Sequence, residues 1–82
     1  MKRKLVIVEW VDAASYSSWS DESNLIASPG TLRITTAGFL VRKTKKVVTV
    51  ALNYDEQGRL ADAISIPANS ITKITAVRIV TL

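Results

Sequence analysis

The chain has 82 residues, contains no cysteine and no histidine, and carries a formal net charge of +4. This length predicts one domain over residues 1–82, and the two missing residue types exclude disulfides, thiolate or imidazole metal sites, and catalysis by histidine. A chain of this size buries only about 60–65% of its unfolded surface. Since disulfides are excluded, association with other subunits is the expected additional source of stability.

The amino-terminal segment is basic and then apolar, but it does not have the form of a secretory signal. Lys2, Arg3 and Lys4 precede an apolar run at residues 5–8, which Glu9 ends. A signal-peptide core needs about 7 to 15 apolar residues. No stretch of the sequence has the length of a transmembrane helix. We therefore expect a cytoplasmic protein with no membrane partner, located in the host cytoplasm if it is viral.

The first predicted strand covers residues 4–11, which are rich in β-branched side chains. Residues 12–30 are rich in serine and lack alternation, which predicts a long loop with a short helical turn near residues 18–24. In so small a domain, a loop of this length is expected to cover or bind something. We expect its apolar side chains to pack over one end of the fold, namely Trp19, Leu25 and Ile26.

Four more strands are predicted after this loop, at residues 31–43, 47–54, 63–66 and 71–80. Gly38 lies near the middle of the second strand, where the absence of a side chain permits a sharp bend or a close backbone approach. Residues 44–46 and 55–59 are polar turns. Residues 67–70 interrupt the β pattern and predict a tight corner, where Pro67 is tolerated because a corner needs no ladder donor.

The predicted strands are apolar on both faces. In the third strand, Val48 and Val50 point one way, whereas Val47 and Ala51 point the other way. A sheet with one solvated face would alternate between apolar and polar residues. Because this short chain has no spare layer for its second face, we expect other copies of the chain to bury it. Unpaired strand edges would support heterologous contacts that close into a ring.

No group of residues predicts catalysis. The acidic residues include the adjacent pairs at 21–22 and 55–56, and neighbouring carboxylates in a strand or turn diverge instead of converging on one point. No histidine is present to activate a serine. The three glycines, Gly30, Gly38 and Gly58, are too far apart for a phosphate-binding loop. We therefore expect no enzymatic activity, no catalytic residue, no cofactor and no metal.

The densest basic cluster is Arg42, Lys43, Lys45 and Lys46, at the turn between the second and third strands. One interpretation is a phosphate-binding surface that becomes a positive rim when the chain forms a ring. The other is a solvated hairpin tip whose lysines hinder edge-to-edge aggregation. The sequence leaves both interpretations open.

The aromatic residues also have two interpretations. Trp10 and Phe39 lie within predicted strands and are expected to be buried. Tyr16 and Trp19 lie in the serine-rich loop, where they would either pack the loop or stack on a ligand. A peptide-binding adaptor of the SH3 type would need Tyr16, Trp19 and Tyr54 to line one exposed groove.

The five strands, the glycine in the bent second strand and the corner at residues 64–71 resemble an Sm-like (LSm) small β-barrel, over about residues 31–82. Residues 8–12, 15–19, 37–41 and 66–67 also resemble short uncharacterised proteins of tailed phages, including cyanophages. The resemblance implies an all-β fold. It would be a strongly bent, five-stranded antiparallel barrel of Sm-like or, alternatively, SH3-like type, assembled as a homo-oligomeric ring of about five to seven protomers.

This chain departs from the Sm pattern where Sm proteins bind uridine. The turn that carries an acidic residue and an asparagine in Sm proteins is basic here, and Pro67 and Ala68 replace the usual arginine and glycine of the corner. Asn69 remains as a candidate base-binding residue. The resemblance therefore implies binding of RNA or single-stranded DNA, with contacts from Arg42, Lys43, Lys45, Lys46 and Asn69. The alternative is a structural or assembly protein of a phage that makes only protein contacts.

Overall fold

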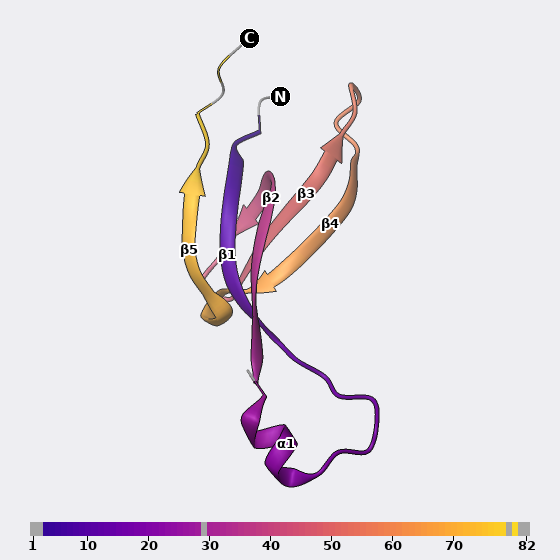
Figure 1. Cartoon of the computed structure of the whole chain (residues 1–82). Helices are drawn as coiled ribbons and strands as arrows, with labels where there is room; N and C mark the ends of the chain where they lie inside the picture. Colours follow the sequence, from indigo (N-terminus) through magenta and orange to yellow (C-terminus); the bar gives the residue numbers. More distant parts are fainter. Residues whose placement is uncertain (1–2, 29, 79, 81–82) are drawn as a thin grey trace.

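The computed structural model of the chain describes residues 3–28, 30–78 and 80. Its strands are β1 (Leu5–Ala13), β2 (Thr31–Lys43), β3 (Val47–Tyr54), β4 (Leu60–Pro67) and β5 (Ile71–Ala76) (Figure 1). Helix α1 (Glu22–Ala27) lies between β1 and β2, and the 3-10 turn η1 (Ala68–Ser70) joins β4 to β5. The strands form one antiparallel sheet in the order β4-β3-β2-β1-β5. The predicted five-stranded antiparallel sheet is thus confirmed.

The predicted bounds hold for β2 and β3 and differ elsewhere. β4 begins at Leu60 because this residue still pairs with Tyr54 of β3. β5 ends at Ala76 because its partner β1 begins at Leu5, whose carbonyl accepts the last inter-strand hydrogen bond from the N–H of Val77 (2.9 Å). Of the predicted remainder of β5, residue 79 lies outside the described residues. No helix in the described part of the chain is long and apolar enough to cross a membrane.

β2 bends sharply, so that its first part pairs with β1 and its last part pairs with β3 (Figure 1). Gly38 lies opposite Val6, just before Phe39, where the pairing of β2 passes from β1 to β3, and the β2–β3 register shifts between Leu40 and Arg42. A Cβ atom added to Gly38 would lie 2.8 Å from the backbone oxygen of Ala51, which is too close for any side chain. The close backbone approach predicted at this glycine is therefore confirmed.

One face of the bent sheet forms the hydrophobic core. The side chains that are at most 2% exposed on this face are Val6, Val8, Val48, Val50 and Ile66. Around them pack the partly buried side chains of Trp10, Leu40, Ile71 and Ile74. The sequence predicted apolar residues on both faces of β1 and β3, and the structure buries one of these faces, although Leu52 on the buried face of β3 is 61% exposed. Leu52 lies beyond Ala51, the last residue of β3 that pairs with β2.

Hydrogen bonds do not close the sheet into a barrel. β4 pairs only with β3, and β5 pairs only with β1, so each has a free edge in the described part of the chain. The predicted corner at residues 67–70 is confirmed as η1, where the Ser70 hydroxyl donates to the carbonyl of Pro67 (2.8 Å). The unpaired strand edges expected from the sequence are therefore present, and β4 and β5 diverge from each other with distance from η1 (Figure 1).

Residues 14–28, called the arm below, project beyond the end of the sheet (Figure 1). The expectation that this loop packs over the fold is wrong. β1 and β2 pair as a two-stranded ribbon as far as Ala13 and Thr31, so the arm begins only after the chain has left the core. No residue of α1 is buried, and the side chain of Trp19 is fully exposed. The helix also lies later than the predicted turn, with Asp21 as its N-cap.

The chain leaves much of its surface uncovered. Its accessible surface is 6828 Å², whereas a compact protein of 9.0 kDa is expected to expose about 4,900 Å². Its radius of gyration is 16.5 Å, against about 12 Å for a compact domain of this length. The outer face of the sheet is only half-buried at Leu5, Ile7 and Val47. The excess of roughly 2,000 Å² is the physical reason to look for further chains that cover this surface.

Asp55 organises the turn between β3 and β4. Its Oδ1 atom accepts hydrogen bonds from the backbone N–H groups of Gln57 (3.0 Å) and Arg59 (2.8 Å), and its Oδ2 atom lies 2.6 Å from Nε of Arg59. The backbone N–H of Arg59, and then its guanidinium and the N–H of Gln57, hold the pKa of Asp55 below its usual range against the opposing effect of desolvation. The carboxylate form is therefore the form that this turn stabilises.

We expect Asp55→Asn to lower the thermal midpoint at pH 7, and the difference from the wild type to shrink at pH 3. A carboxylate with a lowered pKa contributes stability above its unfolded pKa and loses it as the pH falls through the folded value, below about pH 4. Thermal unfolding of both proteins at the two pH values measures this effect. Glu56→Gln, in the same turn, is the matched control and should show no such pH dependence. A gap between wild type and Asp55→Asn that is independent of pH would contradict the assignment.

Candidate nucleic-acid interface

The cluster of four cations at residues 42–46, called the basic turn below, has a backbone that Thr44 holds at its tip. The Thr44 hydroxyl accepts hydrogen bonds from the backbone N–H groups of Lys46 (3.2 Å) and Val47 (3.0 Å). The Thr44 N–H donates to the Val47 carbonyl (2.8 Å) and closes the hairpin. Because the threonine satisfies the backbone of the turn, the side chains of Lys45 and Lys46 are free to remain in solvent, where both are exposed.

The basic turn lies directly beside η1. The backbone N–H of Ala68 donates to the carbonyl of Lys46 (2.9 Å), and Val47 pairs with Pro67 at the end of the β3–β4 ladder. Asn69, the next residue of η1, is exposed. Two segments that are more than twenty residues apart in the sequence thus meet at one end of the sheet, and all five predicted contact residues belong to them.

Arg42 differs from the lysines because its side chain is fixed on the sheet. Its Nε atom donates to Oγ1 of Thr49 (3.0 Å), and that hydroxyl is hydrogen-bonded to Oγ of Ser65 (2.8 Å). This chain of contacts runs across β2, β3 and β4. A guanidinium that is held in place retains further N–H groups for a phosphate oxygen, and it loses less conformational entropy on binding than a free side chain.

The electrostatics of this end are dominated by positive charge. Arg42, Lys43, Lys45 and Lys46 are all exposed, and none of them has a carboxylate partner among the residues that the structure describes. The ion pair found among the described residues joins Arg59 to Asp55 and lies in the β3–β4 turn, away from the basic turn. Unneutralised and solvent-exposed cations of this kind attract polyanions without sequence preference.

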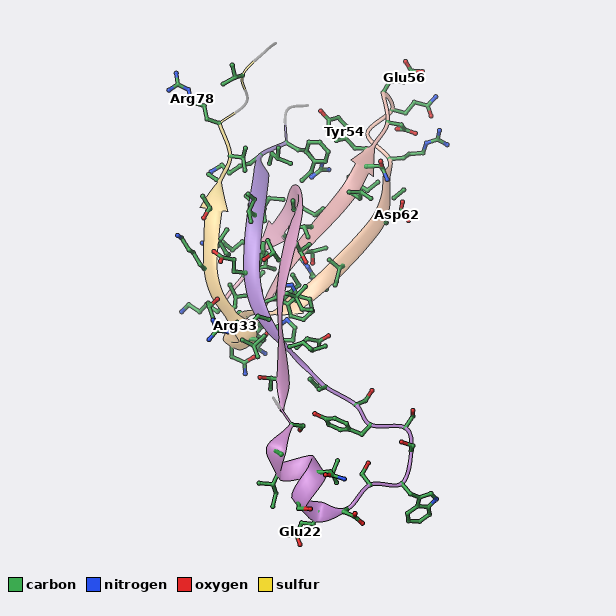
Figure 2. All side chains as sticks on the ribbon, viewed as in Figure 1. Glu22, Arg33, Tyr54, Glu56, Asp62 and Arg78 are labelled. Carbon is green, nitrogen blue, oxygen red and sulfur yellow. The ribbon has the colours of Figure 1, made fainter. Side chains whose placement is uncertain are left out.

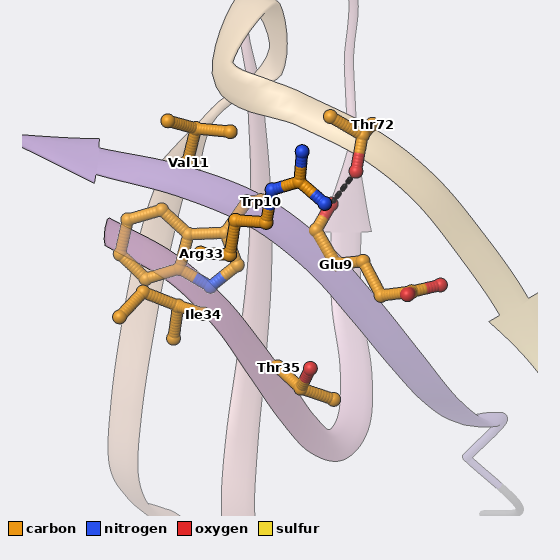
Figure 3. Close-up of a pocket in the computed structure, with 7 residues that line it drawn as sticks. All are labelled: Glu9, Trp10, Val11, Arg33, Ile34, Thr35 and Thr72. Carbon is orange, nitrogen blue, oxygen red and sulfur yellow. Dashed lines mark hydrogen bonds between the residues drawn. The ribbon is translucent and has the colours of Figure 1, made fainter. Parts of the chain in front are cut away.

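A cavity of about 340 Å³ lies on the other side of η1, between β1, β2 and the start of β5 (Figure 3). Its lining includes Trp10, Arg33 and Thr72, and the Thr72 hydroxyl donates to the carbonyl of Glu9 (3.0 Å). Arg33 was not among the predicted contact residues. In the sequence it is an isolated cation within an apolar strand, and only the pairing of β1 with both β2 and β5 places it beside the residues that follow η1.

The aromatic residues do not form a peptide-binding groove. Tyr54 contacts Phe39 edge-on, with ring centroids 4.8 Å apart, at the end of the sheet opposite the arm (Figure 2). Tyr16 and Trp19 belong to the arm, where the Tyr16 hydroxyl donates to Oγ of Ser28 (2.7 Å). Trp10 is partly buried and donates from Nε1 to Oγ1 of Thr36 (3.0 Å). The packing expected of Trp19 within its loop is not observed.

The acidic side chains do not come together in the described part of the chain. No group of three or more histidine, cysteine, aspartate or glutamate residues is arranged there to hold a metal ion. Oδ2 of Asp62 accepts a hydrogen bond from the side-chain amide of Asn53 (3.0 Å), and the carboxylate of Asp55 accepts hydrogen bonds within its own turn.

The arrangement that the residues build is therefore a basic turn and an exposed asparagine around one corner of an open sheet, with a cavity of mixed polar and apolar lining near η1. Its chemistry is that of binding a polyanion. Comparisons of the chain with protein-family models, with curated proteins and with solved structures found no match.

Proposed function

We propose that this chain is an Sm-like protein that assembles into a homo-oligomeric ring and binds RNA or single-stranded DNA through a basic rim. The observation that carries the proposal is the hydrogen bond from the N–H of Ala68 to the carbonyl of Lys46, because it joins the basic turn to η1. This bond brings together the proposed contact residues Arg42, Lys43, Lys45, Lys46 and Asn69.

Three features of the fold support the Sm-like assignment. β1 lies between β2 and β5 in the sheet, the backbone of β2 approaches β3 closely at Gly38, and β4 passes into β5 through a corner of three residues. An open sheet with this order and curvature is the arrangement expected of a small barrel of the Sm-like or SH3-like type. The missing aromatic groove favours the Sm-like alternative over a peptide-binding adaptor.

The ring is supported by the two free edges and by the uncovered surface. β4 and β5 are the two different edge strands of the sheet, so the pairing of β4 in one copy with β5 in the next copy is a heterologous contact. Repeated heterologous contacts close into a ring if the rotation between neighbouring copies allows it. A standard interface buries about 800 Å² on each partner, so two such interfaces on every protomer would cover most of the excess surface. The number of about five to seven protomers follows from the resemblance to Sm proteins.

In this proposal the lysines of the basic turn contact phosphates, and Arg42 presents a fixed guanidinium to the backbone of the nucleic acid. Repetition of the turn around the ring multiplies weak contacts into a continuous positive rim. Asn69 supplies an amide that can donate to and accept from the edge of an unpaired base. Affinity arises from the cations, and any base preference arises from Asn69.

The proposal is tested by fluorescence anisotropy with labelled single-stranded RNA and DNA at several salt concentrations. Four cation–phosphate contacts per site predict a slope of log K against log salt of about −3, or a loss of roughly 50-fold between 50 and 200 mM salt. A protein with the same net charge but no basic cluster is the control for non-specific attraction. Absence of binding at the lowest salt concentration would overturn the proposal.

A second function is favoured by the exposed apolar side chains, which are unusual for a chain that acts alone. They include Trp19, Ile26, Leu32, Leu52 and Val80, all more than half exposed. They suit a structural or assembly protein of a phage whose ring makes only protein contacts. Such a protein would show no salt-dependent binding of oligonucleotides, and charge reversal in the basic turn would leave its assembly unchanged.

A further inference from the structure

The arm presents apolar side chains to solvent from a defined backbone. Trp19 is 104% exposed and Ile26 is 75% exposed. Tyr16 bonds to Ser28 across the two sides of the arm, and Ser28 Oγ donates to the carbonyl of Leu25 (2.7 Å). An arm that is tied internally in this way loses less entropy when it docks than an unstructured loop would lose. Its exposed tryptophan has the character of an interface anchor.

We propose that the arm of one subunit docks on a second copy of this chain, with Trp19 entering the cavity that Trp10 and Arg33 line in the neighbouring subunit (Figure 3). This inference deepens the proposed function, because it rests on the assembly of the chain into a ring. It assigns the arm to the contact between subunits and identifies the surface that receives it.

The size and composition of the cavity suit an indole ring. Its volume of about 340 Å³ falls within the range of sites that hold small aromatic ligands. Val11 supplies an apolar wall on the same face of the β1–β2 ribbon as its pair partner Arg33, whose guanidinium can stack on an aromatic face. The hydroxyl of Thr35 and the carboxylate of Glu9 are acceptors for an indole N–H.

Charge complementarity favours a second copy as the occupant. Asp21 and Glu22 give the arm a charge of −2, and the arm contains no Lys or Arg. Because the net charge of the whole chain is +4, the rest of the chain carries +6. Docking of the arm would place these carboxylates near Arg33 of the neighbour. An acidic arm is poorly suited to an anionic membrane surface, which attracts basic segments.

The positions of the arm and the cavity suit a ring. The cavity lies at the base of the arm, where β1 and β2 leave the core (Figures 1 and 3). The arm and the cavity are therefore at the same end of the folded subunit. Rotation about a ring axis keeps that end of every subunit at one level. An arm that bends sideways therefore meets the cavity of the next subunit and not the far end of the neighbour.

Cysteine crosslinking tests the contact, because the natural chain contains no cysteine. We expect the double variant Ser20→Cys/Thr35→Cys to form covalent dimers and higher oligomers on oxidation, and an equimolar mixture of the two single variants to form covalent dimers. Ser20→Cys/Val80→Cys is the matched control and should stay uncrosslinked beyond background. Crosslinking only within one chain, seen as a monomer band of altered mobility with no ladder, would overturn the inference.

Light scattering coupled to size-exclusion chromatography separates this inference from the proposed ring. We expect Trp19→Ala to raise the protein concentration at which half of the subunits are assembled by about 30-fold, which is the effect of a typical tryptophan hot spot. Val80→Ala should leave this concentration unchanged. Trp19 is fully exposed, so its loss should not impair folding. A monomeric wild type would overturn both the ring and the docking of the arm. A wild-type oligomer that Trp19→Ala leaves intact would overturn the docking of the arm alone.

Discussion

Ile66→Ala is expected to lower the free energy of unfolding by about 2–5 kcal/mol, the range for removal of a fully buried isoleucine side chain. Ile66 has no exposed surface and lies opposite Val48 in the ladder between β3 and β4. The core has few fully buried side chains, and neighbouring strands can close only part of the resulting cavity. A domain of this size has a total stability of only about 4–12 kcal/mol, so the loss takes a large share of it.

Urea unfolding followed by circular dichroism measures this loss, and Ile64→Ala is its matched control. Ile64 lies two residues earlier in β4 and is 39% exposed. We expect its truncation to cost less than half as much, because most of the transfer and cavity terms require burial. If Ile66→Ala does not fold, Ile66→Val should still show a graded loss of about 0.5–1.5 kcal/mol. Equal losses at Ile64 and Ile66 would contradict the placement of the core.

The double change Lys45→Glu/Lys46→Glu is expected to weaken binding of single-stranded nucleic acid by more than about 25-fold at 0.1 M salt. Counterion release from two phosphate contacts alone accounts for this factor, and the two new carboxylates add repulsion. Both lysines are exposed at the tip of a turn that Thr44 holds, so the fold should tolerate the change. Fluorescence anisotropy against salt concentration measures the affinity and the slope, which should fall by about 1.4.

The matched control is Lys4→Glu/Arg78→Glu, which changes the net charge by the same amount. Both residues are exposed, and Arg78 lies at the end of the folded molecule that is opposite the arm (Figure 2). A site in the basic turn predicts a smaller loss for this control. Equal losses in the two variants would mean that affinity follows the net charge and not the basic turn. Unchanged affinity in Lys45→Glu/Lys46→Glu would remove the basic turn from the proposal.

The strands were predictable because their signals are local. β1 and β3 are rich in β-branched residues, which predict extended segments without any knowledge of the partner strands. Because Val47 and Val48 place apolar side chains on both faces of β3, the sequence did not identify the buried face, which is the face of Val48 and Val50. The glycine at position 38 and the proline at position 67 mark the close backbone approach and the corner by their own backbone chemistry. The ends of β4 and β5 were misjudged because a strand ends where its partner ends, which is a non-local fact.

The candidate site was predictable only in part. The cations of the basic turn are adjacent in the sequence, so their cluster is visible there. Arg33 is separated from them and has no local signal. Its place beside Thr72 depends on β1 pairing with both β2 and β5. The arm was expected to cover the fold because Trp19, Leu25 and Ile26 within it are large and apolar, but hydrophobicity does not specify which surface a segment will meet.

The sequence by itself determined which segments extend, where they turn, that the strands carry apolar residues on both faces, and where positive charge gathers. Each of these follows from the covalent geometry and polarity of neighbouring residues. Only the tertiary structure decided the strand order, the meeting of the basic turn with η1, the open edges of β4 and β5, and the projection of the arm. The physical reason is that pairing between distant strands depends on the competition among many possible partners, which no single stretch of residues encodes.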